Sequence, residues 1–280
     1  MKLFLKTISI LLILLFFSSC NSRQTQEKLA DKRLDHIQIL INQNAFNAAK
    51  IEIDSIHSLF PSLVSKRRIA ASLADTIVRC ESSRSLEFCN SILPFKVHQM
   101  DSIQKNFRFE KNLKYQDIGN FVYKNQQTES NAGRTYLKTY VDENADLYLL
   151  SKYCGQKIEH GSIEVSANDL FAHTDTIKSS DPNYHAFEDG GLHFEEVTFK
   201  NQAEKGVLEF IAQTNAKILK ITLHGKKTYT YYLSDGDRKA IIETYHLWKV
   251  KKDVVQLQKE IKKATFKIGK INYYKNKSGK

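Results

Sequence analysis

The C-terminal part of the sequence contains a long apolar pattern that constrains the fold more than any other feature. Its residues alternate at spacings of three and four, the heptad pattern of a helix with one buried face: Leu247, Val250, Val254, Leu257, Ile261, Ala264 and Ile268. The pattern predicts a coiled-coil-like helix that begins with a capping box at Ser234 and Asp237 and ends near Gly269. Because an apolar seam of this length must be covered, we expect it to pack on the N-terminal helices of the same chain. A coiled-coil homodimer is the alternative.

The N-terminal part shows the apolar spacing of helices. Three helices are expected around residues 34–41, 45–60 and 64–93 and should form helical hairpins. Pro94 is expected to end the third helix, because proline removes a helical hydrogen bond. A fourth helix should then continue to about Phe109.

Three cysteines follow residue 20, namely Cys80, Cys89 and Cys154. If Cys80 and Cys89 share one unbroken helix, they lie ~13 Å apart along its axis, which is too far for a disulfide. Only a turn of the chain between them would allow a bridge. The odd number excludes complete pairing, so we expect three buried thiols.

The periodicity changes from helical to alternating after about residue 117. Aromatic and β-branched residues flank turn-forming clusters, which predicts hairpins at residues 134–153, 162–177 and 217–233. A single strand is expected at residues 192–199 and a short helix within 204–215. The resulting seven or eight strands are enough for an antiparallel sheet with its own core.

Together these patterns predict an α+β fold. Its parts are a helical region over residues 20–110, an antiparallel β domain over 111–233, a long helix over 234–268 and a frayed basic tail over 269–280.

The first twenty residues, MKLFLKTISILLILLFFSSC, place a cysteine directly behind an apolar run. The run, Ile8–Phe17, is about half of the ~20 residues that a membrane-spanning helix needs and suits a secretory signal peptide. Two small serines then precede Cys20. This order resembles the lipobox of bacterial lipoproteins, although Phe17 stands where that family usually has an aliphatic residue. The resemblance implies that residues 1–19 are removed and that acyl chains such as palmitate on Cys20 anchor the protein in the membrane.

The residues that follow Cys20, from Asn21 to Gln26, include no acidic residue. In bacterial lipoproteins an aspartate at this point often accompanies retention at the inner membrane. The resemblance therefore implies an outer-membrane location facing the periplasm. The chain as a whole resembles Gram-negative envelope lipoproteins with a helical N-terminus and a β domain, and this resemblance implies a location but no activity.

The positive charge of the chain is concentrated at its C-terminal end. The net charge is +11, of which residues 249–280 carry +9 and the signal region +2. An exported protein is not expected to bind nucleic acid, whereas an anionic membrane attracts each nearby lysine by ~1 kcal/mol, and tyrosines suit its interface. We predict a membrane-surface contact through Lys259, Lys262, Lys263, Lys267, Lys270, Tyr273 and Tyr274. A lysine-rich solvated face is the alternative.

The sequence contains no recognised catalytic or nucleotide-binding motif. The grouping that comes nearest to a metal site consists of histidines with carboxylates nearby in sequence: His160, His173, His185 and His193. Their loose spacing favours solvated surface histidines. We therefore predict no metal site, no cofactor and no catalytic residues.

Three functions agree with these features. The first, which we expect, is a non-enzymatic, lipid-anchored scaffold or adaptor of the envelope with a protein partner there. The second is a module on the β domain that binds a glycan, a peptide or a cell-wall component through exposed tyrosines: Tyr136, Tyr140, Tyr229, Tyr231 and Tyr232. The third is a metal-dependent hydrolase, which requires at least three of the histidines to converge.

Overall fold

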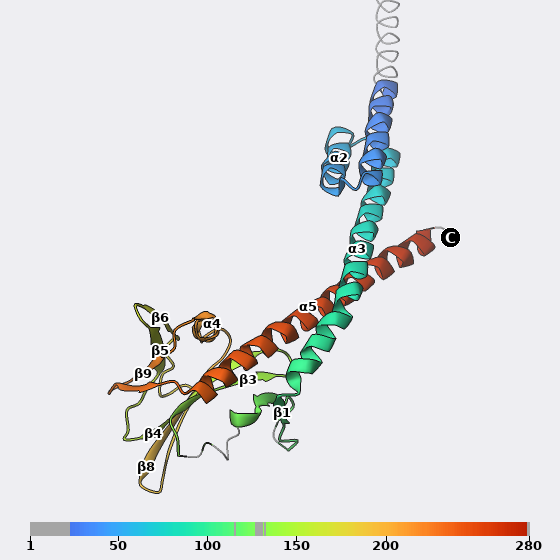
Figure 1. Cartoon of the computed structure of the whole chain (residues 1–280). Helices are drawn as coiled ribbons and strands as arrows, with labels where there is room; N and C mark the ends of the chain where they lie inside the picture. The colour runs from blue at the N-terminus through green and yellow to red at the C-terminus, as the bar shows by residue number, and fades with distance from the viewer. Residues whose placement is uncertain (1–22, 115, 127–130, 132, 279–280) are drawn as a thin grey trace, which may run out of the picture. The chain divides into compact units, whose positions relative to one another are not determined.

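A computed structural model of the chain describes residues 23–278 apart from 115, 127–130 and 132. The predicted signal peptide and Cys20 lie outside the described residues. The chain divides into two compact units. Unit 1 contains the residues up to Cys89 together with those from Glu260 onwards, and unit 2 contains Asn90–Lys259. The fold is α+β, as predicted, with antiparallel sheets and a long C-terminal helix (Figure 1).

Helices build unit 1. A helix at residues 23–42 precedes α2 (Phe46–Leu59), and the first half of α3 (Val64–Gln104) packs with them. Asn44 has a φ of 63°, a left-handed conformation that lets the chain turn between the first two helices. The three helices share one apolar core, which confirms the predicted helical hairpins: Ala30, Leu34, Ile37, Ile41, Phe46, Ala49, Ile53, Ile56, Phe60, Leu63, Ala70 and Ile77.

The helix α3 continues through Pro94, so the predicted break there is wrong. Proline lacks the amide hydrogen that would bond to the carbonyl of Asn90, but Pro94 is exposed, where water can satisfy that carbonyl. The helix ends at Gln104, earlier than expected, because Phe107 begins a strand and pairs with Tyr123.

The three cysteines of the described residues are free thiols. Cys80 and Cys89 both lie in the helix α3. The separation predicted for one unbroken helix therefore applies, and it is too large for a disulfide between them. Only Cys89 is buried, so the expectation of three buried thiols is wrong for two of them. Cys80 lies at the margin of the unit 1 core, and Cys154 lies near the end of a strand.

The described part of unit 2 forms two antiparallel sheets, with strand orders β1-β2-β3-β4-β8-β7 and β10-β9-β5-β6. The strands are β1 (Phe107–Glu110), β2 (Asn120–Tyr123), β3 (Tyr136–Asp142), β4 (Leu147–Gly155), β5 (Ser162–Ala167), β6 (Leu170–His173), β7 (Tyr184–Asp189), β8 (Leu192–Phe199), β9 (Lys220–His224) and β10 (Tyr229–Tyr232). A short 3-10 helix, η1 (Lys124–Gln126), follows β2.

The hairpins β3–β4, β5–β6 and β9–β10, the strand β8 and the short helix α4 (Val207–Gln213) confirm the predicted elements. Three further strands, β1, β2 and β7, were not predicted. Most of β7 is exposed, so no alternation of apolar residues identifies it. It pairs with β8 across a turn at Gly190–Gly191, whose φ values are positive.

Both sheets, α4 and the first turns of the C-terminal helix contribute to one core in unit 2. Leu149 and Phe199 come from the six-stranded sheet, and Val165 and Ile221 come from the four-stranded sheet. All four side chains have no exposed surface. The sheets therefore face each other across a shared apolar layer.

The C-terminal helix α5 (Asp235–Ser278) continues past Gly269, so the predicted frayed tail is wrong. A glycine inside a helix costs about 1 kcal/mol, but the apolar seam continues to Ile271, which is half-buried. Lys275 and Lys277 in the last turn interact favourably with the helix dipole.

The predicted seam of α5 is buried or half-buried at all seven positions. Within unit 2, Leu247 has no exposed surface and packs with Phe107 and Phe121. Lys96 of α3 also forms an ion pair with Asp253 of α5 at 2.6 Å. These contacts agree with packing of the seam inside one chain, while the homodimer remains an alternative prediction.

Among the residues that the structure describes, none of the helices combines the length and the hydropathy needed to cross a membrane.

Candidate functional site

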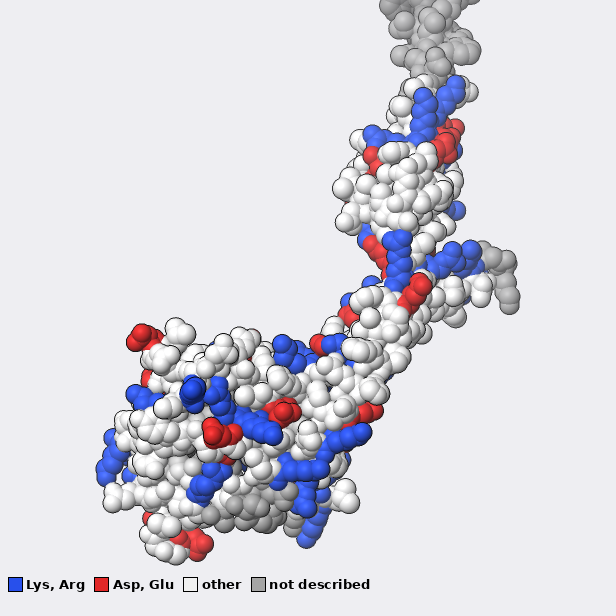
Figure 2. All heavy atoms as spheres, viewed as in Figure 1, with Lys and Arg blue, Asp and Glu red and all other residues white. Residues whose placement is uncertain are grey.

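The end of α5 presents lysines and aromatic side chains on one exposed face. We call this face the basic stripe, and its residues are spaced so that they share one side of the helix: Lys262, Lys263, Phe266, Lys267, Lys270, Tyr273, Tyr274 and Lys277. All of them are exposed, and they lie opposite Ala264 and Ile268 of the seam. Figure 2 shows blue side chains gathered on the last turns of this helix.

Six of the seven predicted membrane-contact residues belong to the basic stripe, and Lys259 is exposed in unit 2. The stripe also contains Phe266, which is 72% exposed and which the sequence analysis missed. Its spacing of four from Lys262 and from Lys270 is the signal that places it on this face. Exposed aromatic residues among lysines are typical of helices that lie on a membrane surface.

A second candidate site is a groove of about 680 Å³ in unit 2, which we call the Trp248 groove. The β3–β4 turn, the loop that follows β8, α4 and one side of α5 line it. Its volume lies within the range of small-molecule binding sites. No sequence pattern predicts this groove, because its lining comes from four segments that are distant in the sequence.

The loops of the groove adopt backbone conformations that non-glycine residues rarely take. Asn201 and Gln202 occupy one turn, Lys205 and Gly206 occupy the next, and all four φ values are positive. Ala145 in the β3–β4 turn has a φ of 66°. The described residues include seven non-glycine positions with positive φ, and four of them line this groove. Each costs ~1–2 kcal/mol, and strain of this kind concentrates at binding sites.

Glu204 supplies the groove with a carboxylate. The side chain is half-buried, and its Oε2 is buried and accepts no hydrogen bond from any residue that the structure describes. A buried acceptor without a partner is unfavourable. This oxygen is therefore not committed to the fold.

Aromatic side chains from α5 form one wall of the groove. The rings of Tyr245 and Trp248 lie 5.4 Å apart. Lys252 places its Nζ 4.7 Å from the centre of the Trp248 ring and covers one face of it. Trp248 is half-buried, and part of its surface is turned to the groove.

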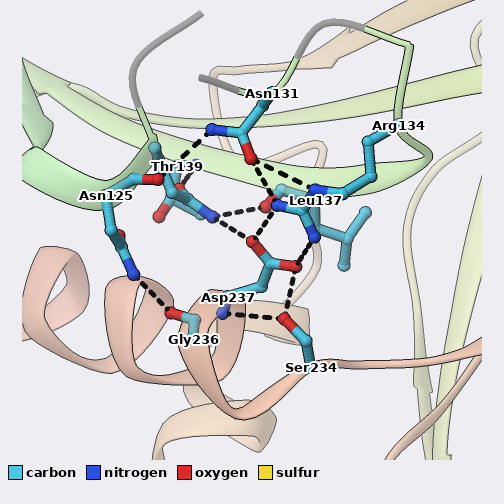
Figure 3. Close-up of polar contacts among 9 residues, drawn as sticks. Asn125, Asn131, Arg134, Leu137, Thr139, Ser234, Gly236 and Asp237 are labelled. Carbon is cyan, nitrogen blue, oxygen red and sulfur yellow. Dashed lines mark hydrogen bonds and ion pairs between the residues drawn. The ribbon is translucent and has the colours of Figure 1, made fainter.

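A buried polar network fastens the first turn of α5 to the six-stranded sheet (Figure 3). Asp237 is 4% exposed and accepts hydrogen bonds from Arg134 at 2.6 and 2.8 Å. The hydroxyl of Ser234 donates to the same carboxylate at 2.7 Å and accepts the Asp237 N–H at 3.1 Å. The helix cap at Ser234 is therefore confirmed, while the Asp237 side chain turns to Arg134 rather than completing the capping box.

Gln126 extends this network into the sheet. Its Nε2 donates to Asp237 at 3.2 Å and to the carbonyl of Leu137 at 2.8 Å, and its Oε1 accepts the N–H of Thr139. Burial alone raises the pKa of Asp237, but hydrogen bonds from Arg134, Ser234 and Gln126 outweigh it and lower the pKa. These polar groups bond to one another, so the network positions α5.

A second buried network joins Ser151, His160 and Glu195. The Nε2 of His160 lies 3.0 Å from the Ser151 hydroxyl, and its Nδ1 lies 2.7 Å from Glu195. The order serine, histidine, carboxylate is that of an acyl-transfer relay. However, all three side chains have no exposed surface, so a substrate carbonyl cannot reach the serine in this conformation.

The Glu195 carboxylate also accepts the backbone N–H groups of Ile158, Glu159 and His160 at 2.8–2.9 Å. Burial alone raises its pKa, but the hydrogen bonds from the His160 side chain and from these amides outweigh it and lower the pKa to about 2. Alternation along β8 places Glu195 on the same buried face as Val197. The sequence signal for this network is the carboxylate at a core-facing position of a predicted strand, because a buried carboxylate needs hydrogen-bond partners.

The four histidines considered for a metal site do not converge. His160 is fully buried, so the expectation of surface histidines is wrong for this residue, whose partners are Ser151 and Glu195. His193 lies 3.4 Å from Glu195 through its Nε2, while His173 and His185 are exposed. Within the described residues, no three metal-ligating side chains come together.

The five candidate tyrosines do not form one exposed patch. Tyr136 is 1% exposed and packs under Arg134, because its strand position faces the interior. Tyr140 stacks on Tyr148. Tyr229 and Tyr232 are exposed, and Tyr231, between them on β10, is half-buried.

Comparisons of the chain with protein-family models, with curated proteins and with solved structures find no match.

Proposed function

We propose that this protein is a lipid-anchored scaffold or adaptor of the bacterial envelope that makes a second contact with an anionic membrane through the basic stripe. The observation that carries the proposal is the placement of five lysines and three exposed aromatic residues on one face of α5, opposite its buried seam. Lysines attract anionic headgroups, and aromatic rings settle at the interface.

The anchor at Cys20 and the basic stripe support each other. The acyl chains hold the protein through buried methylene groups, at ~0.8 kcal/mol each, and a polybasic surface adds electrostatic attraction to anionic lipids. Unit 1 contains both the described residues nearest to Cys20 in sequence and the basic stripe. An outer-membrane location facing the periplasm, with an envelope protein as partner, belongs to this proposal.

The enclosed position of Ser151, His160 and Glu195 supports a role other than catalysis. We assign these residues to the architecture of unit 2. A non-enzymatic role without a cofactor belongs to the same proposal.

The test uses unlipidated protein that begins at Asn21, mixed with vesicles of phosphatidylglycerol or of phosphatidylcholine. Binding should favour phosphatidylglycerol and weaken as salt is added, because the attraction is electrostatic. Replacing Lys262, Lys263, Lys267 and Lys270 by Glu should weaken binding roughly a hundredfold or more.

The control variant reverses four exposed lysines of unit 2, so that its net charge equals that of the first variant: Lys178, Lys200, Lys217 and Lys227. This protein should bind nearly as well as the parent. Equal binding of the parent to both vesicle types, or equal losses in both variants, would reject the membrane contact.

A further inference from the structure

We propose that the Trp248 groove binds a neutral glycan. This site lies within unit 2 and does not depend on the membrane contact of the basic stripe.

The charges that line the groove are balanced. Three lysines and three carboxylates line it: Lys205, Lys252 and Lys259, and Asp146, Glu204 and Glu209. Lys205 also forms an ion pair with Asp175 at 3.4 Å outside this set. A strongly anionic or cationic ligand would meet repulsion as well as attraction here. The balance therefore favours a ligand without net charge.

The groove offers hydrogen-bond donors and acceptors side by side. Four amide side chains line it, namely Asn144, Asn201, Gln202 and Gln256. Amides both donate and accept, carboxylates accept, and ammonium groups donate. Sugar hydroxyls also do both, so they can satisfy such a mixed set, including the half-buried carboxylate group of Glu204.

The wall formed by Tyr245 and Trp248 supplies the apolar contact that the face of a sugar ring needs. Val255, which is half-buried, extends this surface. A glycan has apolar C–H faces and a polar rim of hydroxyls. The groove likewise combines aromatic and aliphatic groups of α5 and α4 with amides, three of which lie on the loops and one, Gln256, on α5.

An extended peptide is the less suitable occupant. Peptides that bind in extended form usually add a strand to an open sheet edge. The edge strands of the two sheets are β1, β7, β6 and β10, and no residue of these strands lines the groove. The groove thus provides no backbone ladder for a peptide.

Trp248 makes the test direct, because it is the single tryptophan of the sequence. Full-length protein purified from membranes in mild detergent is titrated with neutral tetrasaccharides: the β-1,4-linked N-acetylglucosamine tetramer, cellotetraose and maltotetraose. An end-capped tetra-alanine peptide is titrated in parallel. At least one tetrasaccharide should change the Trp248 emission in a saturable way, and the peptide should not.

Two variants locate the binding. Glu204→Gln keeps the size of the side chain but removes its charge, and it should weaken binding roughly tenfold, as expected for one hydrogen bond to a charged group. Gln256→Ala should also weaken binding. Gln258→Ala is the matched control, because it is an exposed glutamine of the same helix that does not line the groove.

The circular dichroism and urea midpoint of each variant should match those of the parent, since the changed residues are exposed or half-exposed. The proposal is overturned if no tetrasaccharide alters the emission at roughly millimolar concentration. It is also overturned if the capped peptide binds as well as the sugars, or if Glu204→Gln and Gln256→Ala bind like Gln258→Ala. None of these outcomes affects the vesicle experiment, which reports on unit 1.

Discussion

The Nδ1 atom of His160 lies 2.7 Å from the Oε2 atom of Glu195, and neither side chain has any exposed surface. Because Glu195 also accepts three backbone N–H groups, it holds residues 158–160 against β8. Glu195→Gln would place an amide NH₂ group among donors that need an acceptor. We expect it to lower the free energy of unfolding by about 3 kcal/mol, measured by urea unfolding with Trp248 fluorescence. Glu188→Gln, which changes an exposed carboxylate on β7, should cost less than about 0.5 kcal/mol.

The lowered pKa of the Glu195 carboxylate predicts that the stability of the fold decreases in acid. The pKa of Glu195 is lowered from 4.5 to about 2 in the folded protein. Its contribution to stability is therefore complete above about pH 4.5 and is lost as the pH falls towards 2, a total of roughly 3 kcal/mol. Urea midpoints measured between pH 6 and pH 2.5 should fall more steeply for the parent than for Glu195→Gln. Parallel pH profiles would contradict the lowered pKa.

The hydrogen bonds of Asp237 should stabilise the junction between α5 and the six-stranded sheet. Asp237→Ala leaves Arg134 and Gln126 without their shared acceptor, so we expect a loss of about 3 kcal/mol in the free energy of unfolding. Arg134→Ala should also be costly, because it leaves the 4%-exposed Asp237 carboxylate with side-chain hydrogen bonds from Ser234 and Gln126 alone among these donors. Asp235→Ala controls for the helix dipole, since Asp235 is an exposed acid in the same first turn. Similar losses at positions 235 and 237 would show that the network adds little.

The buried seam of α5 should also contribute to stability. Leu247→Ala removes a fully buried side chain from its contact with Phe107 and Phe121 and should cost about 2–5 kcal/mol. Lys249→Ala changes an exposed residue on the same turn and should cost less than about 0.5 kcal/mol. Both are measured by urea unfolding, and a small effect of Leu247→Ala would place the seam outside the core of unit 2.

Much of the fold could be predicted because local periodicity and tertiary packing agree. β8 alternates buried and half-buried residues as its sequence suggests, and the heptad spacing of α5 marks the residues that become buried. The prediction of secondary structure failed where solvent exposure or strand pairing outweighed a local sequence signal. Pro94 breaks helices in general, yet here it is exposed inside α3. Phe107 continues the helical spacing of Ile103, but its pairing with Tyr123 places it in a strand.

The candidate sites divide in the same way. The basic stripe could be predicted because it lies on one helix, where spacing determines which residues share a face. The Trp248 groove could not, because Ala145, Glu204 and Trp248 belong to segments that meet only in the folded chain. The buried partner of His160 was hidden for a related reason, since Glu195 lies 35 residues away.

The proposed membrane attachment predicts two separable contributions. Cys20→Ser should abolish labelling by a radioactive or clickable fatty acid, because the acylated thiol is missing. Normal labelling of that variant would reject the lipid anchor. To isolate the basic stripe, residues 1–20 are replaced by an ordinary cleavable signal peptide, so that neither acyl chains nor an uncleaved apolar segment remains. This chain should stay on membranes at low salt and be released at high salt, because surface lysines are screened. The same chain with Lys262, Lys263, Lys267 and Lys270 changed to Glu should be released at both salt concentrations. If both chains remain bound at high salt, the attachment depends on a contact other than the basic stripe.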